Sequence, residues 1–172
     1  MQRSLNTFLF LIALGTCFCG CSQKYGIVKT HTYVREITAG NIPVDQNNNP
    51  TTSGVRKNHI IYVETGSSSE TIPEWQAAWV EGIPFNVEPI VIKKGEVHLG
   101  PLKNETKEVV IKTKKGNQLW QLMLGNKIEL EADSTLKELT QKNKIVITGK
   151  WKGTPFNFPI AEEQQLAKTF GE

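Results

Sequence analysis

Apolar and polar residues alternate along much of this chain, and the alternation has the period of two that is typical of half-buried β-strands. In segment 127–132 (KIELEA), Ile128 and Leu130 share one face and the charged residues share the other. Segments 107–113 and 144–151 alternate in the same way and are rich in β-branched residues. Further strands are predicted at residues 26–37, 59–65, 75–80, 87–92, 96–101 and 119–124.

Short turn signals separate these runs, at residues 115–117, 125–126 and 152–155. Two segments have a helical composition: residues 134–141, which follow Asp133 or Ser134 as a cap, and residues 161–168. Strands and helices do not alternate, so a parallel α/β sheet is not expected. We predict an all-β fold, an antiparallel β-sandwich (immunoglobulin-like or similar) with one or two short helices. The strand order does not follow from the pattern.

One stretch of the chain echoes another. Residues 79–90 and 151–160 both contain, in the same order, Trp, Gly, Pro-Phe-Asn and Pro-Ile. We interpret the echo as two similar hairpins, because Gly relieves strain in a tight turn and Pro fixes φ. Proline also lacks an N–H, so these strands are expected to lie at sheet edges or to begin there.

The amino terminus has a different character. Residues 1–6 are polar with one positive charge, at Arg3, and residues 7–18 are apolar. This apolar run has the length of the core of a signal peptide and is shorter than the ~20 residues that a membrane-spanning helix needs.

The run ends in Phe18-Cys19-Gly20-Cys21, which resembles the lipobox of bacterial lipoproteins. The resemblance covers only the signal segment and implies cleavage before Cys21, a lipid on the Cys21 thiol and acylation of the new amino terminus. Cys17 is an alternative lipidation site. The chain then divides into a signal peptide (residues 1–20), a short tether (21–24) and a single β-rich domain (25–172).

The resemblance also implies the location. Acyl chains would hold the protein at the cell envelope, and Ser22 after the cysteine is similar to the pattern that sorts lipoproteins to the outer membrane, facing the periplasm or the cell surface. The formal net charge of +3 is too weak to indicate a nucleic-acid partner. All three cysteines lie between residues 17 and 21, so the domain itself has no thiol for a disulfide or for catalysis.

Sequence motifs for chemistry are scarce. The chain has no phosphate-binding loop, no dinucleotide fingerprint and no zinc-protease or serine-hydrolase motif. Its histidines, His31, His59 and His98, lie on separate predicted strands. Residues 45–50 begin like a calcium loop, but Pro50 stands where such a loop has glycine. We therefore expect no catalytic residue, no metal site and no cofactor.

The tryptophans are the best candidates for recognition. Trp75 and Trp79 share strand parity, which would place them on one face about 14 Å apart, as a platform for a sugar. The alternative is that they pack in the core. Trp151 has the parity of Ile145 and Ile147 and is expected to be a core residue.

Three functions remain open at this point. The first is a non-catalytic envelope module that binds another envelope protein or serves as an accessory subunit. The second is a carbohydrate-binding lipoprotein that uses Trp75 and Trp79. The third is a hydrolase, which would need carboxylates that meet in a cleft.

Overall fold

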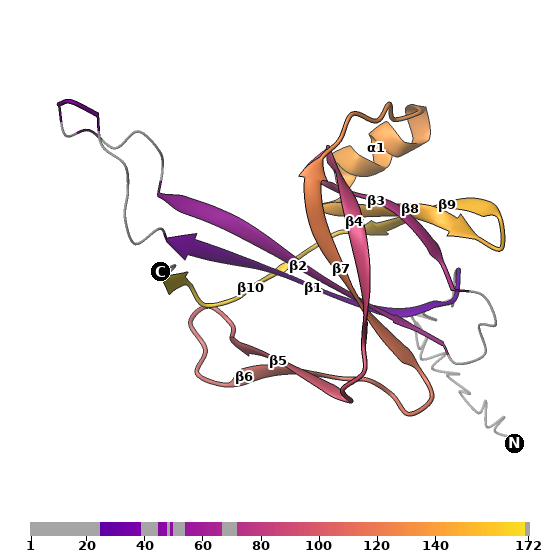
Figure 1. The fold of residues 1–172 in the computed structure, drawn as a ribbon, viewed down its shortest axis with the longest axis horizontal. Helices are drawn as coiled ribbons and strands as arrows, with labels where there is room; N and C mark the ends of the chain where they lie inside the picture. The colour runs from indigo at the N-terminus through magenta and orange to yellow at the C-terminus, as the bar shows by residue number, and fades with distance from the viewer. Residues whose placement is uncertain (1–24, 39–44, 48, 50–53, 67–71, 171–172) are drawn as a thin grey trace, which may run out of the picture.

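The computed structural model describes residues 25–38, 45–47, 49, 54–66 and 72–170. Nearly all of its regular structure is β (Figure 1). The elements are, in chain order, β1 (Ile27–Thr38), β2 (Val55–Thr65), β3 (Glu74–Val80), β4 (Ile83–Ile92), β5 (Glu96–Pro101), β6 (Glu108–Lys112), β7 (Gln118–Lys127), α1 (Ser134–Lys142), β8 (Ile145–Trp151), β9 (Thr154–Ile160), β10 (Gln164–Gln165) and β11 (Thr169–Phe170).

Nine of these strands form one sheet. Its order is β10-β1-β2-β7-β4-β3-β8-β9, and β11 also pairs with β1. Every pairing between the long strands is antiparallel, whereas the two-residue strands β10 and β11 run parallel to β1. Strands β5 and β6 form a separate antiparallel pair. The predicted all-β, antiparallel class is confirmed.

The large sheet curls around its main hydrophobic core. Strands from both halves of the sheet contribute to this core, so the two halves pack against each other like the layers of a sandwich. Full burial of one such aliphatic side chain contributes about 1.5–3 kcal/mol. The buried members are Ile27, Ile61, Val63, Ala78, Val80, Trp120, Leu122, Ile145, Ile147, Phe156 and Ile160.

Two smaller clusters cover the outside of the curl. The β5–β6 hairpin lies over β1, β2 and β7, where Ile111 packs with Tyr33, Tyr62 and Leu119. The helix α1 lies over β3 and β8, where Leu136 packs with residues of both strands. The outer face of the sheet is therefore covered at these two places.

The predicted helix is confirmed at the predicted cap. The Asp133 carboxylate accepts a hydrogen bond from the backbone N–H of Leu136, at 2.7 Å, and so satisfies one of the free donors of the first turn. Leu136 is the buried residue that attaches α1 to the sheet.

The echoed segments form two matching hairpins, as predicted. The β3–β4 turn is Glu81-Gly82 and the β8–β9 turn is Lys152-Gly153. All four residues have positive φ, between 49° and 82°, which is the signature of a two-residue type I′ turn. Strand β9 lies at the sheet edge, and proline is the second residue of both β4 and β9.

The strand predicted at residues 127–132 is wrong, and so is the turn predicted before it. Strand β7 continues through Gly125 to Lys127, and residues 128–133 have no regular structure. Gly125 does not break the strand because the side chain of Asn86, on β4, fills the space that a Cβ would occupy. Glycine here allows close approach between strands.

The helix predicted at residues 161–168 is also wrong. This segment contains β10, and Leu166 forms an isolated bridge with Leu102. Leu166 is fully buried in the cluster beneath the β5–β6 hairpin. Burial of this leucine and pairing with β1 outweigh a helix propensity that is worth only fractions of a kcal/mol per residue.

Close packing between β8 and its neighbours predicts a strong effect at Gly149. An added Cβ there would lie 2.5 Å from the Glu74 carbonyl oxygen and 3.0 Å from the Phe156 ring. We expect Gly149→Ala to lower the free energy of unfolding by about 1–3 kcal/mol. Gly95→Ala is the matched control, since no atom lies within 4 Å of its added Cβ. Equal unfolding midpoints in urea for the two variants would contradict this packing.

Candidate functional site: the seam between β1 and β9

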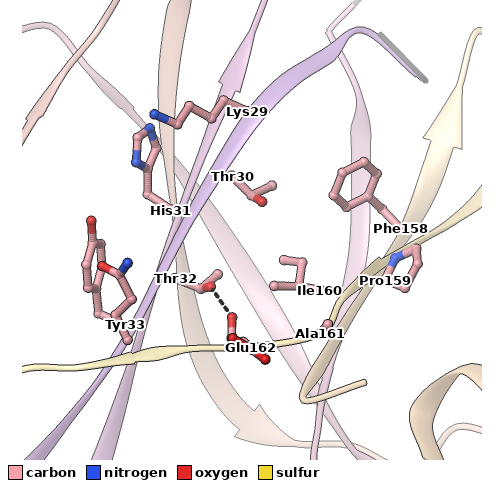
Figure 2. A pocket seen from close by; sticks show the side chains of 11 residues that line it. Lys29, Thr30, His31, Thr32, Tyr33, Phe158, Pro159, Ile160, Ala161 and Glu162 are labelled. Atoms are coloured by element: carbon pink, nitrogen blue, oxygen red, sulfur yellow. Dashed lines mark hydrogen bonds between the residues drawn. The ribbon is translucent and has the colours of Figure 1, made fainter. Parts of the chain in front are cut away.

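The curled sheet does not close on itself. Strand β1 pairs with β10 and β11 only from Tyr33 onward, and β9 pairs only with β8. Within the described chain, one edge of Ile27–Thr32 and one edge of Thr154–Ile160 thus have no strand partner. A cavity of about 560 Å³ separates these edges, and we call it the seam (Figure 2).

Both ends of the seam are bridged. At one end, the Thr32 hydroxyl donates a hydrogen bond to the Glu162 carbonyl oxygen at 3.0 Å. At the other end, the ring of Tyr25 stacks on the ring of Phe156, with centroids 4.8 Å apart. Gly26 lies so close to the ring of Trp151 that a Cβ would collide with it. The seam is therefore a bounded slot.

Strand direction explains why the edges do not pair. Six antiparallel pairings lead from β1 through β2, β7, β4, β3 and β8 to β9. After an even number of reversals, β9 runs in the same direction as β1. Joining these edges would need a parallel pairing, which is slightly less stable per residue than an antiparallel one.

Prolines also protect the β9 edge. In a two-residue hairpin the closing pair, Trp151 and Thr154, is hydrogen-bonded, and backbone groups alternate in direction along a strand. The backbone groups of Pro155, Asn157 and Pro159 thus point toward the seam. Two of these three residues have no N–H, and proline on an exposed edge hinders indiscriminate strand addition.

The lining of the seam combines polar and apolar side chains. Lys29, Thr30 and His31 lie on the β1 side, while Phe158 and Pro159 lie across the opening (Figure 2). The Nε2 atom of His31 is buried and has no hydrogen-bond partner in the described part of the chain.

Burial is the main cause that lowers the pKa of His31, and the nearby Lys29 ammonium lowers it further. The Glu64 carboxylate opposes the shift. Glu64 is itself buried and accepts hydrogen bonds from Lys114 N at 3.1 Å and Asn117 Nδ2 at 2.6 Å. His31 is therefore neutral at pH 7.

A second polar cluster lies beyond the bridged end of the seam. His59 Nδ1 is 2.9 Å from the Glu163 carboxylate, and their side chains are 14% and 6% exposed. Both line a cavity of about 140 Å³ together with Glu81 and Lys144, which form an ion pair at 3.6 Å. Two carboxylates share this cavity, but each is paired with a basic side chain and the space suits only a few waters.

The tryptophans do not form the predicted platform. The register of β3 against β8 shifts between Trp75 and Ala77, so that Gln76 is an extra residue. Such a bulge reverses the parity of the residues that follow it. Trp75 packs against the main core, whereas Trp79 is 5% exposed beneath α1. The expectation that the two share one exposed face is wrong, while Trp151 packs against the main core as predicted.

The remaining candidates from the sequence do not gather in one place. Cys21 and Cys17 lie outside the described residues. The Asp45 carboxylate accepts hydrogen bonds from the backbone N–H groups of Asn47 and Asn49, as expected of a polar turn. His98 contacts Glu96 and Glu108 at the surface. Among the described residues, no group of three His, Cys, Asp or Glu side chains is arranged to hold a metal ion.

The seam itself was not predicted from the sequence. The signal that comes nearest to it is the pair of prolines in residues 151–160, which correctly marks an edge strand but does not identify the strand opposite.

Comparison with known proteins adds no relative, because no protein family, no curated protein and no solved structure matches the chain. In the part of the chain that the structure describes, no helix is long and apolar enough to cross a membrane.

The environment of His31 predicts how stability changes with pH. On acidification the unfolded chain takes up a proton at this residue near pH 6.5, while the folded protein resists it. The free energy of unfolding should thus fall as pH drops below about 7. In the His31→Gln variant the free energy of unfolding should change less with pH in this range.

His98→Gln is the control for that measurement. Hydrogen bonds to Glu108 and Glu96 raise the pKa of His98, so its contribution to stability is present at low pH and is lost as pH rises through the folded value. Removing His98 should therefore steepen, not flatten, the loss of stability on acidification. Parallel curves for His31→Gln and the unmodified protein between about pH 7 and pH 5 would refute the assignment.

Proposed function

We propose that this protein is a cell-envelope lipoprotein, anchored by acyl chains on Cys21, whose β-domain binds a partner without catalysing a reaction. The observation that carries the proposal is the apolar segment 7–18 followed by Gly20-Cys21. Each buried CH₂ of an acyl chain contributes about 0.8 kcal/mol, so two or three chains would hold the protein at the membrane essentially permanently.

The geometry of the domain supports binding more than catalysis. At the seam, two strand edges have no strand partner in the described chain, and apolar and cationic side chains lie beside them. The seam's volume of about 560 Å³ is that of an ordinary ligand site. In the cavity that Glu81 and Glu163 line near the seam, Glu81 forms an ion pair with Lys144 and Glu163 contacts His59.

The tether sets the reach of the module. Residues 21–24 would span at most about 14 Å when fully extended. The proposed site would therefore work close to the lipid surface, at the outer membrane and facing the periplasm or the cell surface. A partner there would be another envelope component.

The carbohydrate-binding alternative has less support than this proposal. Its basis was a flat pair of exposed indoles, and Trp75 and Trp79 lie on opposite faces of the sheet. The hydrolase alternative would need a free pair of carboxylates, which neither cavity beside Glu162 and Glu163 offers.

The lipid anchor predicts the effect of removing one thiol. Cys21→Ala should leave the signal uncleaved at this site and the amino terminus without thioether-linked lipid. In cells that express it, the variant should lose metabolic labelling with a palmitate analogue, and mass spectrometry should find no acylated mature chain.

Cys17→Ala is the matched control, because it removes a cysteine from the same segment and leaves Gly20-Cys21 intact. It should be labelled and fractionate with membranes like the unmodified protein. The proposal fails if Cys21→Ala retains the lipid label, or if Cys17→Ala alone abolishes it.

A further inference from the structure

We propose that the seam binds one extended polypeptide segment of a partner protein, which pairs antiparallel with β1 and completes the curled sheet as a closed barrel. This inference rests on the proposed function in one respect: it names the class of partner that the anchored module binds.

Strand direction is the first observation behind it. Seven strands, from β1 to β9, are joined only by antiparallel pairings, and their two outer edges run parallel to each other. One added strand of opposite direction would be antiparallel to both edges. The product would be an eight-stranded barrel, a size whose interior side chains can fill.

The edge of β1 supplies the hydrogen bonds. The Val34 carbonyl accepts from Leu166 N on the side of β1 that faces the seam. Because backbone groups alternate along a strand, those of Thr30 and Thr32 point to the same side. Thr30 therefore offers a backbone N–H and a carbonyl to an added strand. Main-chain hydrogen bonds of this kind are how sheet edges bind extended peptides.

The edge of β9 is complementary but poorer in donors. It presents the carbonyls of Pro155, Asn157 and Pro159 and a single N–H, that of Asn157. A segment in the seam would thus both donate hydrogen bonds to β1 and accept them from it, whereas with β9 it would mostly donate. A β9 strand from a second copy of the protein would fit this position less well, because its prolines lack the N–H groups that would donate to the carbonyls of the β9 edge.

Side chains at the seam define the sequence that fits. Inward-facing residues of the segment would meet Thr30, Phe158 and Ile160, and outward-facing residues would meet Lys29 and His31 (Figure 2). The segment should therefore alternate apolar residues with acidic or hydrogen-bonding ones. The open edge Ile27–Thr32 extends for about 20 Å, which accommodates about six residues.

The test uses the full-length, lipidated protein in detergent micelles and a phage library of random linear peptides of about twelve residues. Selected peptides are synthesised with a fluorophore, and their affinity is measured by anisotropy. We expect enrichment of alternating apolar and acidic residues. Thr30→Pro, which removes the seam-facing N–H but no bond to β2, should weaken binding by about tenfold or more.

Val91→Pro is the matched control. Like Thr30, Val91 is half-buried. This part of β4 pairs with β7 on one side and has no strand partner on the other side in the described chain. Pro89 lies two residues before Val91, so the backbone groups of both residues point to the same side, which we take to be the open one. The Val91→Pro variant should bind the peptides like the unmodified protein. If Thr30→Pro fails to fold, judged by near-ultraviolet circular dichroism, Asn157→Pro tests the opposite edge and should also weaken binding.

Several results would overturn the inference. They are the selection of no peptide, equal binding to the Thr30→Pro and Val91→Pro variants, a bound peptide that is helical by NMR, or binding of glycan fragments in place of peptides. Anchoring through Cys21 is read separately by lipid labelling. Peptide binding can therefore fail while the anchor stands, and the anchor can fail while the seam still binds peptide in detergent.

Discussion

Strand direction governs the architecture of this domain. Antiparallel pairing connects seven strands in a curl, and seven is an odd number, so the first and last strands are parallel where they meet. The curl can bury one large core, but it cannot close with the pairing that it uses everywhere else. The seam between β1 and β9 is the consequence, and the two-residue strands β10 and β11 pair with β1 only beyond the seam, in parallel.

The rest of the chain stabilises this incomplete closure. After β9 the backbone crosses to β1, and it is held at the crossing by the bond between Thr32 and Glu162 and by the pair of His59 and Glu163. Beyond the crossing, Leu166 is fully buried under the β5–β6 hairpin. These contacts fix the two edges relative to each other, so a segment that entered the seam would find its position already formed.

Local signals in the sequence predicted the parts of the fold that depend on neighbours along the chain. Alternation located most long strands, Asp133 located α1, and glycine with proline located the paired hairpins. Predictions failed where distant contacts decide. Gly125 lies within a strand because of Asn86, Gln76 is extra because of the register with β8, and Leu166 is drawn into a distant cluster. The seam depends on strand order, which alternation does not encode.

Site-resolved amide exchange by NMR, on the free full-length protein, tests the open seam most directly. The backbone N–H of His31 and of Tyr33 points toward β2, whereas that of Thr30 points toward the seam. The structure predicts slow exchange for His31 and Tyr33 and fast exchange for Thr30, although all three belong to one strand. Slow exchange at Thr30 as well would show that the edge is already paired, and it would contradict an open seam.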